Sequence, residues 1–552
     1  MNEANFQNFA PPEQNEAEFQ DFVPPEQNDP EFRDVTPPEA NNAPYTDLRD
    51  YSSFECVFAW LCILIGYLFC CAFPPNEFPL GTFFVMVICV AATFVCLVRK
   101  KARIGATAIA SAVLSLIFSF AFLLNTSNFP TFVSFICALV SYAFFVYRAT
   151  GNTSGRGNAD FLPLELLRAL KGFSIYAIAD MFRLMFTRKK RGFKAILKIL
   201  VGLIAAVIPT AVVISLLSYD GRFSELLRNA FSFIIDFDFR EQLAYISFGT
   251  VIAMYIFGIY AVNTCDRKPI DCDSLRERSE RVRVAPLLTV SATLFPLAVV
   301  YIFFFVSQWD YYLSAFTGKL PEGVVNYAEY ARSGFFELCT VSAINLVIII
   351  AVALFTRRTG KGEKLFLRIV SAVLSVMTLV LIGTALAKMA LYIDKFGLTV
   401  KRLLSSWLMV VIALIFVFII IRCFVKRFRL FAASTVAVVL MCGLLVMSDY
   451  NSFIANYNVD RYISGETEEI DLKALVNADT SAVPAIAKLM EYCQENGKID
   501  SYGYTRLNCK LLDEKKHLDK QNEIFSFSFP SERAKNAIEE FYAKYPLETT
   551  AP

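Results

Sequence analysis

The chain has 552 residues, of which 56% are hydrophobic, and its formal net charge is only +2. A soluble domain is usually about 45–50% apolar, so the excess predicts a protein that spans a membrane. The single histidine, His517, lies in a polar run near the C-terminus. Haem ligation by imidazole, HExxH zinc chemistry and histidine-based catalytic triads are therefore excluded from the apolar part of the chain.

Residues 1–52 form an acidic arm with a net charge of about −10. The arm contains three copies of a 13-residue unit with a Pro-Pro-Glu run, at residues 2–14, 15–27 and 28–40. This unit is too short and too rich in proline to fold alone, so we predict disorder. The arm is either a multivalent docking segment that binds a protein partner through Phe6, Phe19 and Phe32, or a linker without a partner.

The central part of the chain, residues 53–448, contains eleven long apolar runs. A transmembrane helix needs about 20 such residues. The runs are 54–73, 79–98, 104–124, 129–147, 199–217, 243–263, 285–306, 334–355, 366–387, 405–421 and 430–448. We therefore predict an all-α integral membrane protein with about eleven transmembrane helices embedded in a lipid bilayer. No cleavable signal peptide precedes the first run.

The loops between these runs alternate between rich and poor in Lys and Arg. One set carries about 30 of these residues and the other about 9, the asymmetry that keeps basic loops in the cytoplasm. The alternation predicts a multi-pass protein with a cytoplasmic N-terminus and an extracytoplasmic C-terminus. Because the basic residues lie in short loops, we interpret them as setting the orientation of the protein in the membrane rather than as binding nucleic acid.

Two further segments are apolar but interrupted by charges. Residues 161–186 include Glu165, Arg168 and Asp180, a pattern typical of a helix lying in the membrane interface. The alternative, that 161–186 spans the membrane, would place basic loops on both sides. Residues 223–235 are similar and shorter, and favour an interfacial or re-entrant helix.

Residues 449–552 have the composition of a small, mainly helical extracytoplasmic domain. Ile486, Leu489, Met490 and Cys493 share one helical face, and a second helix is predicted from about Ser531. Between the two predicted helices, the stretch from Ile524 to Phe529 alternates like a strand. The chain has 14 cysteines and no CxxC pair. Cys493 and Cys509 are either bridged or unpaired.

Three polar clusters fall on the predicted outer side. In residues 326–337, Glu329 and Glu337 share a helical face, and Arg332 can pair with Glu329. Glu337 lies at the edge of the hydrocarbon, where a carboxylate is costly unless it is paired or faces a cavity. It is therefore either a functional group or half of a structural ion pair. The acid–base use of Glu329 and Glu337 seen in glycosidases is geometrically possible and has no other support.

The second cluster, residues 388–402, is a basic loop that contains Asp394 and Arg402. It either contacts lipid head groups or the acids of the first cluster, or is an ordinary solvated loop. The third cluster, residues 449–462, contains Asp460 and Arg461 and joins the last span to the tail. Its spacing does not match an EF-hand, so it favours docking of the tail onto the membrane core over calcium binding.

The runs YAEYARSGFFEL (327–338), LYIDKFGLTVKR (391–402) and IANYNVDRYISG (454–465) resemble a bacterial family of multi-pass membrane proteins. This family is domain of unknown function 4173, with a relative numbered 4153, and the resemblance covers roughly residues 180–495. In that family the second run is usually closer to YGLT, where this chain has Phe396. The resemblance implies a fold and a bacterial cell membrane, and it transfers no catalytic residue.

We therefore predict a non-enzymatic envelope sensor, scaffold or complex component, with no catalytic residue, cofactor or metal. Its candidate functional surface comprises Glu329, Arg332, Glu337, Asp394, Arg402, Asp460 and Arg461. One alternative is a small-solute transporter that uses Glu337. Another is a membrane-embedded transferase acting on a lipid-linked substrate, with Glu329 or Asp394 as base.

Overall fold

The structure is a computed structural model of the chain. It describes Glu277 and residues 52–73, 78–102, 104–152, 161–187, 239–265, 280–307, 327–357, 360–497, 501–520 and 524–546. The chain divides into two units, Met1–Leu48 and Arg49–Pro552, and every described residue belongs to the second. The repeats of the arm, the predicted span 199–217 and the segment 223–235 lie outside the described residues.

The described part of the chain is helical, and its only β contact is an isolated bridge between Ala285 and Thr356. Ten of its helices are long and apolar enough to cross a membrane. They are α1 (Ser53–Ala72), α2 (Pro79–Arg99), α3 (Ala106–Phe120, continued by the 3₁₀ turn Ala121–Leu123), α4 (Asn128–Ala149), α9 (Phe239–Cys265), α11 (Leu287–Ser307), α13 (Tyr327–Phe355), α14 (Lys361–Phe396), α15 (Val400–Phe424) and α16 (Leu430–Met447). The structure thus confirms an all-α multi-pass membrane protein, and ten of the eleven predicted spans correspond to these helices.

Local sequence signals set the ends of these helices. At the start of α1, the backbone amide of Ser52 donates to Glu55 Oε2 over 2.7 Å, as in a capping box. Pro79 occupies the first turn of α2, where its missing N–H costs nothing. Arg99 and Arg148 lie in the last turns of α2 and α4, where a positive charge interacts favourably with the helix dipole.

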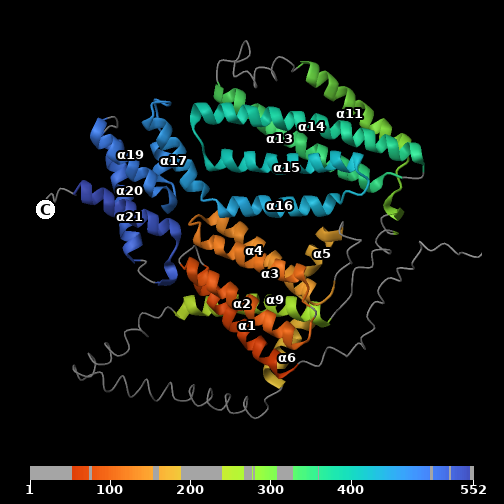
Figure 1. The fold of residues 1–552 in the computed structure, drawn as a ribbon, viewed down its shortest axis with the longest axis horizontal. Coiled ribbons are helices and arrows are strands. Elements are labelled where there is room, and N and C mark those ends of the chain that lie inside the picture. The colour runs from red at the N-terminus through yellow and green to blue at the C-terminus, as the bar shows by residue number, and fades with distance from the viewer. Residues whose placement is uncertain are drawn as a thin grey trace, which may run out of the picture. The chain divides into compact units, whose positions relative to one another are not determined.

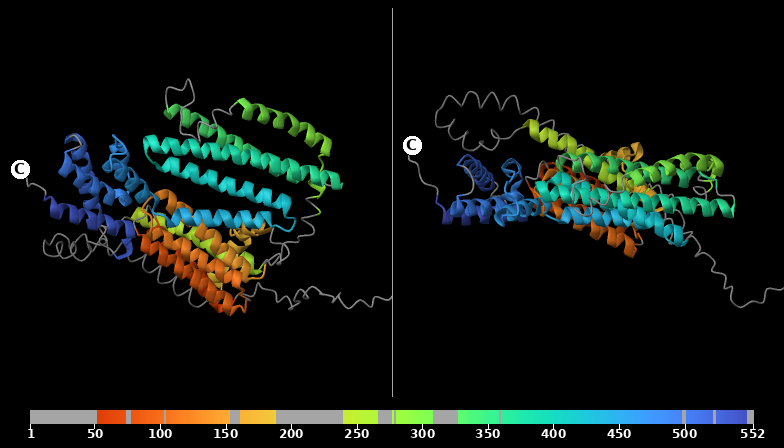
Figure 2. Two further views of the ribbon diagram at one scale, coloured as in Figure 1. Left: turned by 45° about the horizontal axis from the view of Figure 1, so that its top comes forward. Right: turned by 90° about the horizontal axis from the view of Figure 1, so that it is seen from above.

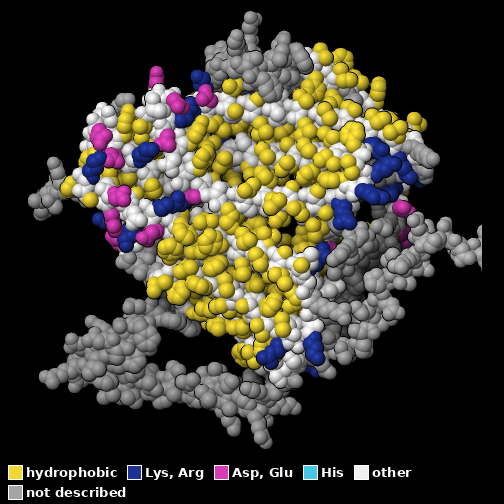
Figure 3. Space-filling model, viewed as in Figure 1, with side chains coloured by type: hydrophobic (Ala, Val, Ile, Leu, Met, Phe, Trp, Pro, Cys, Tyr) yellow, Lys and Arg dark blue, Asp and Glu magenta, His cyan; other side chains and the backbone are white. Residues whose placement is uncertain are grey.

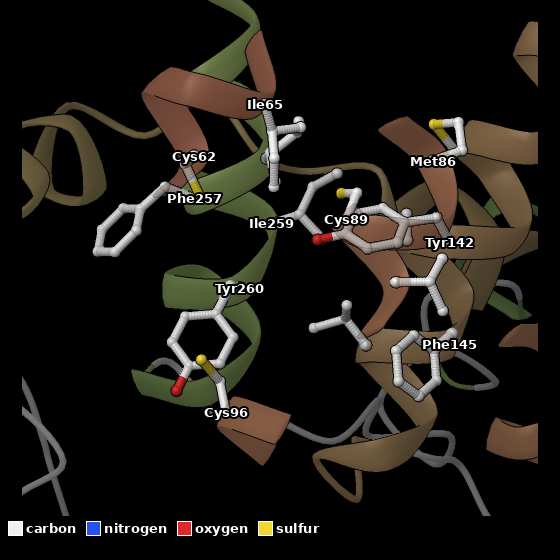
Figure 4. Packing of buried hydrophobic residues seen from close by; sticks show 14 of the residues in the cluster. Cys62, Ile65, Met86, Cys89, Cys96, Tyr142, Phe145, Phe257, Ile259 and Tyr260 are labelled. Atoms are coloured by element: carbon white, nitrogen blue, oxygen red, sulfur yellow. The ribbon is translucent and has the colours of Figure 1, made fainter. Parts of the chain in front are cut away.

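The first helix bundle consists of α1 to α4 and α9, which share one apolar core. Gly66 of α1 packs against Gly249 of α9 so closely that a Cβ on Gly66 would lie 2.0 Å from the Gly249 carbonyl oxygen. Small residues at such crossings let membrane helices approach to backbone contact. Figure 4 shows Cys62, Cys89 and Tyr142 among the apolar side chains of this core. The cysteines here pack as small hydrophobic residues, as the sequence predicts.

The second bundle consists of α11, α13, α14 and α15, again with its own core. Polar side chains tie its helices together inside the apolar packing. The Tyr301 hydroxyl donates to Asn345 Oδ1, and Asn345 Nδ2 donates to Thr378 Oγ1 over 2.9 Å. These bonds join α11, α13 and α14, as interhelical hydrogen bonds commonly do in membranes.

Helix α16 lies between the two bundles, as Figures 1 and 2 show. It contacts α15 on one side and α4 on the other, and Trp407 Nε1 of α15 donates to the Met441 carbonyl over 3.1 Å. On the side of the first bundle, Asn125 Nδ2 donates to the Val446 carbonyl over 2.6 Å. A single helix therefore packs against both bundles.

The two ends of the membrane helices differ in their charged side chains. Lys and Arg gather at one end, whereas acidic and basic side chains mix over the C-terminal domain at the other (Figure 3). We call these the basic end and the tail end. At the basic end, Lys100 pairs with the buried Glu55 over 2.5 Å, and Arg148 pairs with the buried Glu165 over 2.6 Å.

The segment 161–186 forms two short helices, α5 (Leu162–Ala169) and α6 (Ile175–Thr187). Helices of 8 and 13 residues are shorter than the roughly 20 residues that a span needs. The break between them contains Gly172, where an added Cβ would clash with the side chain of Tyr255 on α9. The alternative in which this segment is one span is therefore wrong.

The tail, from Asp449 onwards, forms a helical domain with its own core. Its helices are α17 (Tyr450–Ile463), α18 (Leu472–Val476), α19 (Val483–Asn496), α20 (Ser501–Lys520) and α21 (Phe529–Lys544), with 3₁₀ turns at Thr480–Ala482 and Ile524–Ser526. The predicted helix with Ile486, Leu489, Met490 and Cys493 on one face is α19, and all four side chains are buried. The second predicted helix is α21, in which Ala534, Ile538 and Phe541 are buried.

Two details of the tail differ from the sequence analysis, and one open alternative is decided. Residues 501–520 form α20, a helix that the sequence analysis does not include, because Leu507, Leu511 and Leu518 fall on one buried helical face. The stretch from Ile524 begins with a 3₁₀ turn and is not a strand. Cys493 is buried, Cys509 is exposed, and both are free thiols, so the bridge is absent.

Candidate functional site

The second and third motif runs meet at the tail end. Residues 391–402 form the end of α14, the turn after it and the start of α15, whereas residues 454–465 lie mostly in α17. Asn458 of α17 joins them by two backbone bonds. Leu398 N–H donates to Asn458 Oδ1, and Asn458 Nδ2 donates to the Leu398 carbonyl, each over 2.8 Å.

Gly397 makes this approach possible. Its φ is +74° and its ψ is 175°, a conformation open almost only to glycine. A Cβ at this position would lie 2.6 Å from Asn458 Oδ1. Phe396 is half exposed, with its ring centroid 5.2 Å from that of Tyr392. The glycine is therefore required both by the turn and by its partner.

Two arginines hold the same turn from opposite sides. Arg402 of α15 donates to the carbonyls of Phe396, over 2.8 Å, and Gly397, and it stacks 4.1 Å from the centre of the Tyr392 ring. Arg461 of α17 donates to the Asp394 carbonyl and pairs with the Asp394 carboxylate, both over 2.9 Å. These bonds satisfy carbonyls that the end of α14 leaves without helical partners.

Arg461 also pairs with Glu466 over 3.0 Å. Although partial burial lowers the pKa of its guanidinium, the hydrogen bond to Glu466, the Tyr457 hydroxyl and the Asp394 charge raise it above its ordinary value. Asp394, Arg402 and Arg461 thus lie together, as three members of the predicted functional surface. Asp460 points elsewhere and pairs with Lys488 of α19 over 2.7 Å, with both side chains about half exposed.

The first motif run is only partly described, since the side chains of Glu329 and Arg332 lie outside the described set. Glu337 of α13 is exposed, and its charge acts on Lys388 of α14, whose side chain is buried. An electrostatic influence of this kind is what an ion pair between Glu337 and a residue of another span would produce. No contact described here joins Glu337 to Asp394, Arg402 or Arg461.

The tail also contacts the first bundle, through the loop between α3 and α4. Thr126 Oγ1 donates to Asp479 Oδ2 over 3.2 Å and lies 3.3 Å from Ser481 Oγ. Asn451 Nδ2 of α17 donates to the same Asp479 oxygen over 2.8 Å. The tail domain therefore docks onto both bundles, at Thr126 on one and at the turn 396–399 on the other.

A cavity of about 890 Å³ lies between these two docking points. Its lining includes Ser127 of the first bundle, residues 395–402 of the second, and residues of the tail between Asn451 and Asp479. The membrane core supplies Lys395, Lys401 and Arg402, and the tail supplies Arg461 and the acids Glu469, Asp471 and Asp479. A volume of several hundred cubic ångströms with a few converging polar groups is typical of small-ligand sites.

The described residues contain no group of three or more His, Cys, Asp or Glu side chains placed to hold a metal ion. The polar composition of residues 449–462 predicted docking rather than calcium binding, and α17 makes that docking contact. Sequence analysis missed Gly397, Asn458 and Asp479 as site residues. The Gly-Leu-Thr turn before an apolar run was a signal for Gly397. Asn458 and Asp479 gave no such signal, because their partners are distant in sequence.

Asp479 is the titratable group most affected by this arrangement. Burial, and then the charge of Asp449, raise the pKa of its carboxyl from 3.8 to about 6, although hydrogen bonds from Thr126 and Asn451 act in the opposite direction. A carboxyl whose folded-state pKa is raised favours the folded state fully below its unfolded pKa, and that contribution is lost as pH rises through the folded pKa.

We therefore expect docking of the tail to weaken as the pH rises from about 4 to about 6, with little further change from this group above pH 7. Hydrogen exchange of the peptide that covers residues 470–482, in the full chain in lipid nanodiscs, measures this. In the Asp479→Asn variant the pH dependence should disappear. The matched control is Asp513→Asn, at an exposed position on α20, which should retain it. Identical pH profiles for wild type and Asp479→Asn would contradict the assignment.

The fold and site define a multi-pass helical membrane protein whose C-terminal domain borders a cavity lined by charged and apolar side chains at one end of the spans. The chain belongs to the family described as Domain of unknown function (DUF4153), whose model matches residues 108–489. This match begins in α3 and ends in α19, so it contains both docking points and the whole cavity lining. The family that matches is thus number 4153, which the sequence analysis names as a relative of family 4173. No curated protein and no solved structure matches the chain.

Proposed function

We propose that this protein is a non-enzymatic sensor of the bacterial envelope, in which the cavity between the membrane core and the tail domain binds a small zwitterionic ligand. One observation supports the proposal: the cavity is lined by residues of both bundles and of the tail. A ligand bound there contacts all three parts, so its binding energy can shift their relative arrangement.

The charges around the cavity support the choice of ligand class. Lys395, Lys401 and Arg402 offer partners for a carboxylate or phosphate on the side of the membrane core. Glu469, Asp471 and Asp479 offer partners for an ammonium group on the side of the tail. A short peptide or another compound with an anionic group and an amine matches this separation of charge, whereas a simple anion would leave the acids facing it.

The orientation of the chain is part of the proposal. The Lys and Arg side chains at the basic end support a cytoplasmic location for that end, and hence an extracytoplasmic tail and cavity. In this arrangement the acidic arm lies in the cytoplasm, where its three repeats would dock a protein partner. Fusion of alkaline phosphatase to the C-terminus tests the orientation, because the enzyme folds only outside the cytoplasm. An inactive phosphatase fusion together with a fluorescent cytoplasmic reporter would overturn it.

Ligand binding is tested on the full chain in nanodiscs with glycyl-glycine as the zwitterionic probe. We expect slower hydrogen exchange in the peptides that cover residues 391–402 and 450–480. N-acetylglycine, which lacks the ammonium group, and ethanolamine, which lacks the carboxylate, should protect these peptides less. Equal protection by all three compounds, or protection by none, would contradict the proposed ligand class.

Charge reversal on each side of the cavity sharpens this test. Lys401→Glu and Glu469→Lys alter exposed side chains that form no ion pair described here, so both variants should fold. Each should abolish the protection by glycyl-glycine. Lys516→Glu, at an exposed position on α20 remote from the cavity lining, is the control and should retain it.

Transport is a second candidate function, favoured by one observation. Lys388 is buried within the span formed by α14, and Glu337, near the start of the span Phe335–Ala353 in α13, acts on it electrostatically. Ionisable residues within spans often mark ion or substrate paths. A solute-driven pH change inside proteoliposomes, reported by a pH-sensitive dye and lost in Glu337→Gln, would support transport. Absence of flux in wild type with unchanged folding of Glu337→Gln would leave Glu337 as a structural partner.

A further inference from the structure

The described residues 524–529, at the start of α21 and just before it, expose their apolar side chains and bury their two serines. Ile524 is 80% exposed and Phe525 is 54% exposed, and Phe527 and Phe529 also lie at the surface. Ser526 and Ser528, between them, are buried. Ser528 Oγ accepts a hydrogen bond from Ser531 N–H over 3.2 Å and so caps α21. A domain surrounded by water on this side would have the opposite pattern. We call the four apolar residues the aromatic edge.

The aromatic edge lies against the membrane helices of the first bundle. The Phe525 Cβ would be 3.8 Å from a Cβ added to Gly81, near the start of α2. The Phe529 ring centroid is 6.2 Å from that of Phe120, at the end of α3. Figure 1 shows the start of α21 close to the tail end of α2. The aromatic edge therefore sits at the level where these two spans end.

The surface of α2 and α3 beside this edge is also apolar and exposed. Phe84, Ile117 and Phe120 all present large hydrophobic side chains outward. In helices that cross a membrane, such side chains face lipid. The aromatic edge adjoins this surface through the contacts at Gly81 and Phe120, and residues 524–530, which read IFSFSFP, carry no charge. The surface that meets lipid on the spans thus extends onto the tail domain.

We propose that the aromatic edge inserts into the lipid leaflet at the tail end and anchors the tail domain to the bilayer. Aromatic side chains concentrate at the membrane–water interface, and an exposed apolar patch of this kind marks an interaction site. Lipid is the occupant, because the edge adjoins the lipid-facing surface of α2 and α3. The tail then has a third attachment, separate from Thr126 and from the turn 396–399. This inference does not depend on the proposed ligand.

Photo-crosslinking tests the anchor in the full chain. The photoreactive amino acid p-benzoylphenylalanine replaces Ile524 by suppression of an amber codon, and the protein is purified and reconstituted in phosphatidylglycerol–phosphatidylethanolamine nanodiscs. Because Ile524 is mostly exposed, the replacement should not disturb folding. After illumination we expect mass spectrometry to find phospholipid attached to the peptide that contains position 524.

The matched control carries the same amino acid at Lys516, an exposed polar position on α20. It should give severalfold less phospholipid adduct than position 524. Equal adduct at the two positions would overturn the proposal, as would crosslinking of position 524 to a second copy of the chain or to another protein in place of lipid. A third site at Phe84, on the lipid-facing surface of α2, is the positive control for adduct detection.

Discussion

Replacement of Gly397 by alanine should detach the tail domain from the second bundle. The backbone conformation at Gly397 costs other residues roughly 1–3 kcal/mol. The new Cβ would also lie 2.6 Å from Asn458 Oδ1, and overpacking of this kind costs roughly 1–3 kcal/mol. Hydrogen exchange of residues 450–463, in the full chain in nanodiscs, should therefore report a free energy of opening that is lower by roughly 2–6 kcal/mol.

Gly465 offers a matched control for this variant. Its φ is +78°, and a Cβ there would meet no atom within 4 Å. Gly465→Ala should therefore lower the free energy of opening only by the backbone term, about 1–2 kcal/mol. Equal effects of the two substitutions would show that the contact with Asn458 contributes nothing to docking.

Replacement of Arg461 by alanine should have the second large effect. The side chain pairs with Asp394 and Glu466 and satisfies the Asp394 carbonyl at the end of α14. The Arg461 side chain is mostly buried but both carboxylates are 61% exposed, so each ion pair contributes about 1 kcal/mol or less, and the bond to the Asp394 carbonyl about 1 kcal/mol. We therefore expect a loss of roughly 1–3 kcal/mol in the free energy of opening. The same hydrogen-exchange measurement applies, read for residues 391–398 as well as 450–463.

Lys488→Ala serves as the control for Arg461→Ala. Lys488 and Asp460 form an ion pair between two half-exposed side chains, and such pairs contribute about 1 kcal/mol or less. Arg461→Lys separates charge from geometry, because lysine retains the charge but cannot reach all the partners of the guanidinium fork. A normal free energy of opening in Arg461→Lys would mean that only the charge at this position matters.

The membrane spans could be predicted because lipid imposes one simple rule on composition. A stretch such as 430–448 must be a helix if it crosses the bilayer, and α16 occupies Leu430–Met447. The grouping of spans into two bundles could not be predicted in this way. Nearly every face of such a helix is apolar, so nothing in the sequence around Gly66 indicates that Gly249 is its partner.

In the C-terminal tail, a helix could be predicted only where apolar residues repeat clearly along one helical face. Helix α19 was identified because Ile486, Leu489, Met490 and Cys493 fall in one clean repeat. Helix α20 was missed because its buried leucines are separated by Lys, Asp and Glu over most of its length. The stretch 524–529 alternates as a strand does, yet its alternation places apolar side chains outward and serines inward.

The candidate site was predicted in its composition more than in its contacts. The sequence analysis identified Asp394, Arg402 and Arg461 as candidate residues, and the structure places the three around one turn. It also brought forward Asp460, which instead contacts Lys488 within the tail. Polarity alone identifies which residues are costly to bury, but it does not identify their partners, as Asn458 and Leu398 illustrate.

The docking of the tail at Thr126 and at Leu398 also has a consequence for biogenesis. During translation both loops emerge from the ribosome well before α17, so both groups of helices must be inserted before the final helices can clasp them. The tail therefore docks at both points only when the loops that carry Thr126 and Leu398 lie on the same side of the membrane. A chain in which one of these loops lies on the opposite side would leave the tail partly undocked and more accessible to proteases.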